Sequence, residues 1–92
     1  MSDTITLDDV DVSTITGKPY KVILFNDEHH GMDEVINQID KAIHCGQGQA
    51  YKLMMEAHNV GRAVIFGGSL ERCELVAEIL EEIRLGTKIE PA

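Results

Sequence analysis

Two short runs of β-branched and aromatic residues constrain the fold most: YKVILF at 20–25 and RAVIF at 62–66. Such runs are typical of buried strands, and the first has the character of a central strand. Between and after them, the apolar residues recur at three- and four-residue steps, which is the spacing of one face of a helix. The chain therefore mixes strands with helices, and the order of these patterns limits the possible architectures.

Three segments show the helical spacing, and turn-forming or capping residues bound them. We expect the run CGQG at 45–48 to stop the first helix, Gly61 to end the second in a left-handed conformation, and Gly86 to end the third. Ser69 is expected to cap the third helix, with the carboxylate of Glu71 in its first turn. The apolar faces consist of Met32, Val35, Ile36, Ile39, Ala42 and Ile43 in the first helix; Ala50, Leu53, Met54 and Ala57 in the second; and Leu70, Cys73, Val76, Ala77, Leu80 and Ile83 in the third.

The remaining pattern completes the topology. Gly67 and Gly68 are expected to form a turn after the second strand, and residues 87–89 a short last strand. The order strand, helix, helix, strand, helix, strand predicts an α+β fold. We expect a small sandwich in which a three-stranded antiparallel sheet packs against three helices. A length of 92 residues is enough for one domain.

Residues 1–18 differ in composition from the rest of the chain. They are polar and acidic and offer too little apolar surface to offset the cost of ordering, so we expect a flexible acidic N-terminal extension before a folded core over 19–92. This segment lacks the basic and apolar regions of a secretory signal. Cys45 and Cys73 form neither a CxxC pair nor a disulfide framework, and reduced thiols fit the cytoplasm. We expect a cytoplasmic protein that is monomeric by default.

The charge balance excludes two classes of partner. The formal net charge is −8, from 8 basic and 16 acidic side chains. Nucleic acids and anionic membranes both require a cationic surface on the protein, so neither is an expected partner. No run is long and apolar enough to span a bilayer either.

Two polar clusters are the candidates for binding chemistry. One is the loop NDEHH at 26–30, directly after the first strand, and the other is His58 near the end of the second helix. Each alone is compatible with an ordinary turn or helix end. Together they offer amide, carboxylate and imidazole acceptors, which a primary ammonium group with its three donors requires. Met32, Met54 and Met55 are pliable enough to line a pocket for large apolar side chains, although plain core packing also explains them.

The segments YKVILFNDEHHGMDEVI and AYKLMMEAHNVGRAVIFGG resemble the ClpS family of N-degron adaptors. The specific features are a strand that ends in N-D-[DE] with a methionine shortly after, and the motif L-M-x-x-x-H before a strand with Gly-[KR]-Ala. The resemblance covers about residues 19–90. It implies a binding module without catalysis, cofactor or metal. Such adaptors recognise proteins whose first residue is Phe, Leu, Tyr or Trp and deliver them to the N-terminal domain of a ClpA- or ClpC-type unfoldase, for degradation by ClpP.

The resemblance also implies roles for individual residues. Met32 stands where the family has the methionine that excludes β-branched first residues, and Glu71 stands where it has an acidic contact to the unfoldase. The acidic extension matches the mobile segment needed for delivery. The residues implied to hold the free α-amino group are Asn26, Asp27, Glu28 and His58. The residues implied to line the side-chain pocket are Leu24, His30, Met32, Val35, Met54, Ala57 and Leu85.

Three positions depart from the family pattern. Glu28 replaces a second aspartate, HHG at 29–31 replaces Tyr-Thr-Pro or a similar run, and Val76 replaces a basic residue of the third helix. The first two changes leave open which first residues are preferred, and the third bears on the contact with the unfoldase. The amine-binding set itself is complete.

Three other readings remain open. A scaffold module with the same fold would lack amine recognition, so that Asn26 and His58 would be dispensable. A zinc-binding module would use His29, His30 and His58 with Asp27 or Glu28, although their spacing matches no established motif. A hydrolase with a Cys, His and Asp set is the least favoured, because no nucleophile motif surrounds either cysteine.

Overall fold

The computed structural model describes residues 18–92, so the predicted flexible extension lies, except for Lys18, outside the described residues. The elements are β1 (Tyr20–Phe25), α2 (Met32–Ile43), α3 (Gln47–Val60), β2 (Arg62–Gly68), α4 (Leu70–Glu81) and β3 (Thr87–Pro91). The three strands form one sheet in the order β2-β1-β3, and both strand pairs are antiparallel. The predicted α+β fold and its element order are confirmed.

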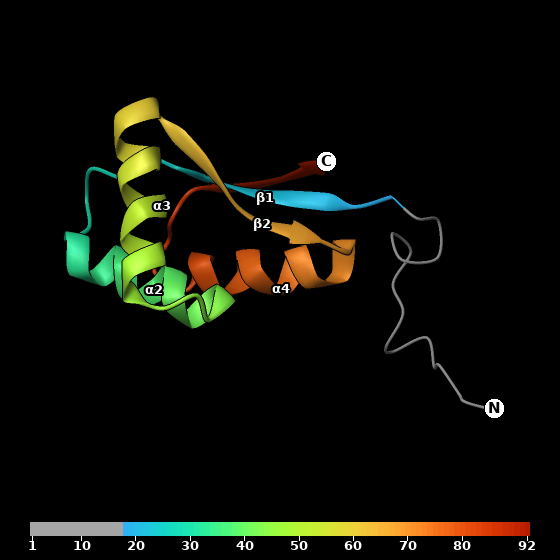
Figure 1. Cartoon of the computed structure of the whole chain (residues 1–92), viewed down its shortest axis with the longest axis horizontal. Helices are drawn as coiled ribbons and strands as arrows, with labels where there is room; N and C mark the ends of the chain where they lie inside the picture. Colours follow the sequence, from blue (N-terminus) through green and yellow to red (C-terminus); the bar gives the residue numbers. More distant parts are fainter. Residues whose placement is uncertain (1–17) are drawn as a thin grey trace.

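The helices bury one face of this sheet. Figure 1 shows α4 running beneath the strands, α2 beside it, and α3 standing across one end of the sheet. α4 packs against all three strands, while α2 packs against α3 and α4, and α3 packs against β2. No helix within residues 18–92 is both long and apolar enough to cross a membrane.

The central place of β1 follows from its composition. Val22, Ile23 and Leu24 are all buried, although successive side chains of a strand point to opposite faces. Val22 and Leu24 belong to the main core between sheet and helices, whereas Ile23 lies opposite Val64 and Lys88 on the other face. A run without polar alternation therefore marks the strand that is paired on both edges and whose side chains are buried on both faces.

The connection between α2 and α3 differs from the sequence expectation. α2 ends at Ile43, where His44 adopts a left-handed conformation with φ 53°. α3 begins at Gln47, so Gly48, expected in the turn, lies in the helix. The carboxylate of Asp40 explains the shortness of this connection, because its Oδ1 accepts the backbone N–H of Gly46 at 2.8 Å. His44 and Gly46, with φ 53° and 88°, together turn the chain between the two helices.

Two further boundaries were predicted wrongly. Gly67 and Gly68 do not form a turn but extend β2, where they pair with Lys21 and Tyr20. No turn is needed there, because α4 starts directly after β2. As predicted, Ser69 caps α4: its hydroxyl accepts the backbone N–H of Arg72.

α4 ends at Glu81 and not at Gly86. Arg84 takes the left-handed conformation with φ 64°, its N–H bonds to the Glu81 carbonyl at 2.9 Å, and the Leu85 N–H bonds to the Leu80 carbonyl at 3.3 Å. This pair of bonds is a Schellman motif, in which the apolar residues at its two ends come together. Leu80 and Leu85 are both buried here. Ile83, predicted on the helix face, lies in this turn, and the carbonyl of Gly86 instead accepts the Phe25 N–H at 3.0 Å.

Gly61 and Gly48 provide a matched test of these assignments. Neither has another atom within 4 Å of where a Cβ would stand, but Gly61 has φ 102° whereas Gly48 lies in α3. We expect Gly61→Ala to destabilise the fold by about 1–2 kcal/mol, because an L-residue is strained in the left-handed region. Gly48→Ala should stabilise it by up to about 1 kcal/mol. Urea unfolding measures both, and equal effects of the two substitutions would contradict the assignment of Gly61 as the helix-ending residue.

Candidate functional site

A pocket of about 330 Å³ lies where the loop after β1, the start of α2, the length of α3 and the turn after α4 meet. The residues that line it are Leu24, Phe25, Asn26, Asp27, Glu28, His30, Met32, Val35, Tyr51, Met54, Met55, Ala57, His58 and Leu85. Every residue predicted for binding the amino group or the side chain is among them. The fold thus gathers positions that are up to 61 residues apart in the chain, from Leu24 to Leu85, around one cavity.

The inner wall of the pocket is apolar and comes from the core. Leu24 of β1, Val35 of α2, Met54 and Ala57 of α3, and Leu85 after α4 are all buried. They belong to the same cluster that packs the sheet against the helices. Because these side chains are held by core packing, the wall is preformed rather than assembled on binding.

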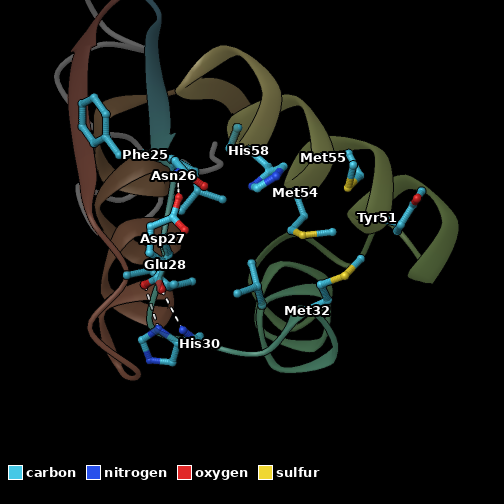
Figure 2. A pocket seen from close by; sticks show the side chains of 14 residues that line it. Phe25, Asn26, Asp27, Glu28, His30, Met32, Tyr51, Met54, Met55 and His58 are labelled. Atoms are coloured by element: carbon cyan, nitrogen blue, oxygen red, sulfur yellow. Dashed lines mark hydrogen bonds and ion pairs between the residues drawn. The ribbon is translucent and has the colours of Figure 1, made fainter.

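The polar end of the pocket depends on one backbone hydrogen bond. The N–H of Asn26 donates to the carbonyl of Gly61 at 3.0 Å, which joins the end of β1 to the end of α3. His58 lies three residues before Gly61 on that helix, so this bond brings Asn26 and His58 to the same end of the pocket. Figure 2 shows the His58 ring directed from α3 toward the loop that carries Asn26.

The side chain of Asn26 is oriented by Glu28. Its Nδ2 donates to Glu28 Oε2 at 2.5 Å. With the amide nitrogen engaged in this way, the carbonyl oxygen of Asn26 remains as an acceptor. Glu28 contributes a carboxylate at the exposed edge of the same loop. This end of the pocket therefore presents acceptors and negative charge.

Asp27 has a different environment from its neighbours. Its Oδ1 accepts the backbone N–H groups of His29 at 2.6 Å and His30 at 2.8 Å. Its Oδ2 lies 2.7 Å from Nδ1 of His30. The carboxylate is only 11% exposed. Asp27 thus folds the loop 26–30 back on itself, as aspartate side chains do in turns.

These contacts shift the ionisation of both partners. Partial burial raises the pKa of Asp27, but the hydrogen bonds from the backbone of His29 and His30 and from the His30 ring outweigh it, and the pKa lies below its usual value. The hydrogen bond to Asp27 raises the pKa of His30 against the effect of partial burial. The carboxylates of Asp27 and Glu34 and the backbone of Ile83 add to this rise. The two groups are therefore both charged over a wide range of pH.

Two residues of the pocket, Phe25 and Tyr51, were not named for it from the sequence, and Met55 was named only as a methionine pliable enough to line a pocket. Phe25 contributes at the end of β1, and Tyr51 and Met55 contribute from α3. Tyr51, Met55 and His58 stand at positions i, i+4 and i+7 of one helix, which share a face. That spacing was available in the sequence as a signal. Glu71 lies in the first turn of α4 and does not line the pocket.

The geometry bears on the zinc-binding reading. Within the part of the chain that the structure describes, no three His, Cys, Asp or Glu side chains are placed to hold a metal ion together. Acceptors at one end and a buried apolar wall at the other instead suit a ligand with a donor-rich head and an apolar side chain.

Comparison with known proteins identifies the relatives of this chain. Residues 16–87 match the family model of the ATP-dependent Clp protease adaptor protein ClpS. The ATP-dependent Clp protease adapter protein ClpS of Gloeobacter violaceus is 42% identical over 73 residues, which covers 78% of each chain. A segment of the E3 ubiquitin-protein ligase UBR1 of Drosophila melanogaster is 29% identical over 72 residues, which is 78% of this chain and 4% of the ligase.

A solved structure extends the similarity to three dimensions. Agrobacterium tumefaciens ClpS2 bound to L-phenylalaninamide superposes with a TM-score of 0.77 at 25% sequence identity. The superposition covers 82% of this chain and 98% of that protein.

The ion pair of Asp27 and His30 predicts how stability depends on pH. A raised pKa in the folded state means that the stabilising effect of His30 is complete below about pH 6.5, the usual value of unfolded histidine, and is lost as the pH rises through the raised pKa. At acid pH, the stabilising effect of the ion pair is lost only below about pH 4, because the lowered pKa of Asp27 keeps its carboxylate charged down to that range. We therefore expect the free energy of unfolding of the wild type to fall, relative to that of His30→Gln, as the pH rises above about 6.5.

Urea unfolding at several pH values measures this difference. His29→Gln is the matched control, because the His29 side chain is exposed and only its backbone contacts Asp27. Parallel pH profiles for the wild type and His30→Gln would rule out the predicted coupling.

Proposed function

This chain belongs to the ClpS family of ATP-dependent Clp protease adaptors, and from that premise we propose that it is an N-degron adaptor. An adaptor is a binding protein, so the family membership confirms the prediction that the chain is not an enzyme. In the proposed function, the pocket binds the free α-amino group and the large apolar first side chain of a protein. The adaptor then delivers that protein to the protease.

The observation that carries the proposal is the division of the pocket into a polar and an apolar end. The carbonyl oxygen of Asn26 and a ring nitrogen of His58 accept hydrogen bonds from the ammonium group, and Glu28 adds negative charge beside them. Asp27 contributes its charge, while its oxygens hold the loop in shape. The L-phenylalaninamide bound by the structural neighbour carries the same two features, a free amino group and a large apolar side chain.

The apolar end selects the side chain. Leu24, Val35, Met54, Ala57 and Leu85 provide a buried wall that suits Leu, Phe, Tyr or Trp. A methionine-containing wall adapts to side chains of different shape. At the mouth of the pocket, Met32 excludes side chains that branch at Cβ. His30, which is 19% exposed and held by Asp27, closes the wall near the loop.

The expected affinity is micromolar or somewhat tighter. Each hydrogen bond to a charged group contributes about 1.5–3 kcal/mol, and burial of one large apolar side chain contributes about 1.5–3 kcal/mol. The loss of rigid-body freedom opposes this sum. A net value near about −8 kcal/mol corresponds to micromolar binding, which allows an adaptor to release its cargo.

Delivery requires a second surface and a partner. We propose that the partner is the N-terminal domain of a ClpA- or ClpC-type unfoldase, which feeds ClpP, and that Glu71 in the first turn of α4 contacts it. Residues 1–18 serve as the extension needed for delivery, and the core over 19–92 binds the cargo. The proposed setting is the cytoplasm, with the adaptor as a monomer. A scaffold without amine recognition is the alternative that the following experiment separates.

Acetylation of the peptide N-terminus tests the amine site. Because it removes the charge and two of the three donors, we expect N-acetylation of a peptide that begins with Leu to weaken binding by at least about tenfold. His58→Ala should weaken binding of the free peptide by a similar factor. Fluorescence anisotropy with labelled peptides measures these affinities. His29→Ala is the control, since His29 does not line the pocket and should leave the affinity unchanged. A scaffold protein would bind neither peptide, and equal binding of both would contradict the amine site.

The gate role of Met32 predicts a change in selectivity. Met32→Ala opens the mouth of the pocket, so peptides that begin with Ile or Val should gain affinity relative to a Leu peptide by several-fold. The same anisotropy assay gives the ratio of the dissociation constants. Leu75→Ala removes an apolar side chain of comparable exposure on α4, outside the pocket, and serves as control. If the ratio of the dissociation constants for the Ile and Leu peptides is unchanged in Met32→Ala, Met32 is not the residue that excludes β-branched side chains.

A further inference from the structure

We propose that Tyr51, Met55 and Met32 form a second subsite, which binds an apolar side chain at the second residue of the N-degron. This inference rests on the proposed function, since it assumes that the first residue occupies the inner pocket. We call these three residues the outer shelf. It lines the same cavity as the amine site, but the proposed recognition of the first residue leaves Tyr51 and Met55 without a role.

The exposure of the lining residues divides the pocket into two parts. The inner wall residues are all less than 10% exposed, whereas Met32 is 52% and Tyr51 is 46% exposed, and Met55 is half-buried. Single exposed apolar side chains are normal on protein surfaces. Here two exposed apolar side chains, Met32 and Tyr51, and the half-buried Met55 line the same cavity as the inner wall.

The helix aligns the shelf with the amine site. Tyr51, Met55 and His58 share one face of α3, with rises of about 4.5 Å from His58 to Met55 and about 10 Å from His58 to Tyr51. Figure 2 shows Tyr51 and Met55 along α3 beyond Met54, and the Met32 side chain directed from α2 toward the part of α3 that carries Tyr51. The shelf therefore begins about one residue length from the point where the amino group is held.

The position of the amino group determines what reaches the shelf. With the amine at Asn26 and His58 and the first side chain against the inner wall, the rest of the peptide leaves through the mouth of the pocket. In an extended polyproline-type conformation, successive side chains are rotated by about 120°, so the second side chain lies sideways over the rim. One side of the rim is the acidic loop with Glu28, and the other is the outer shelf.

The chemistry of the shelf defines its occupant. Tyrosine and methionine are enriched where proteins bind peptides, because an aromatic ring gives a rigid contact and a thioether gives an adaptable one. The shelf contains no charged side chain, while the opposite rim carries carboxylates. An aromatic or long aliphatic second residue is therefore favoured, and an acidic one is disfavoured by repulsion from Glu28.

A peptide series with Leu first and Ala, Leu, Phe or Glu second tests the subsite. We expect Phe or Leu at the second position to bind about three- to tenfold more tightly than Ala, and Glu more weakly. Tyr51→Ala should reduce the advantage of Phe over Ala at this position to less than about twofold, with little effect on the Ala peptide. Tyr51→Phe, which keeps the ring, should retain the advantage.

The matched controls separate this proposal from the function on which it rests. Tyr51 is exposed on a helix, where alanine is the best helix former, so the variant should fold, and thermal unfolding verifies this. Leu75→Ala should leave the affinities of the whole peptide series unchanged.

If acetylation abolishes binding but the second residue has no effect, the subsite is wrong while the adaptor function stands. If no peptide binds through its amino group, both are wrong. If Tyr51→Ala weakens all peptides equally and dissociates a dimer in sedimentation, the shelf joins two copies of the chain and the subsite is overturned.

Discussion

The hydrogen bond from the Asn26 N–H to the Gly61 carbonyl is the contact on which the site depends. It closes the end of β1 against the end of α3, immediately beyond the last paired residues, Phe25 and Arg62. Gly61 is also the residue that lets α3 end and the chain turn into β2, since its φ of 102° is open to glycine. One glycine thus ends the helix that carries His58 and accepts the bond that places Asn26 beside it. The fold and the site share this residue, so strain at Gly61 disturbs both.

The loop 26–30 divides its polar groups between shape and binding. Asp27 uses its carboxylate to accept two backbone N–H groups and to pair with His30, which satisfies it in a partly buried place where an unpaired charge would be unfavourable. Glu28 reaches outward instead and engages the amide nitrogen of Asn26. The longer side chain of Glu28 makes this possible from the exposed side of the loop. Two adjacent carboxylates therefore have different roles, because the backbone directs one inward and the other outward.

Most of the fold could be predicted from the sequence because hydrophobic periodicity distinguishes its strands from its helices. The errors concern glycines. Gly48, Gly67, Gly68 and Gly86 were expected to break or turn the chain, yet all lie in or beside regular structure, while His44 and Arg84 adopt the left-handed conformation at two helix ends. A sequence shows where a left-handed residue is tolerated, but neighbouring hydrogen bonds, such as those of Asp40 and of the Schellman turn, decide where one is formed. The candidate site was anticipated through its resemblance to a family, whereas Tyr51 was missed, because its only signal, a helical spacing from His58, is shared by every residue on that face of the helix.

The pocket is a cavity at the edge of the hydrophobic core. In a domain of this size, the side chains that pack the sheet against the helices and those that line the cavity are largely the same residues. Substitutions of Leu24, Val35 or Leu85 consequently change stability together with binding, which limits how far the inner wall can vary between relatives. Met32 and Tyr51 at the rim are about half exposed, so substitutions there are not limited by core stability in the same way. In the proposed function, selectivity is therefore most easily altered at the rim, while the inner wall sets the general preference for large apolar side chains.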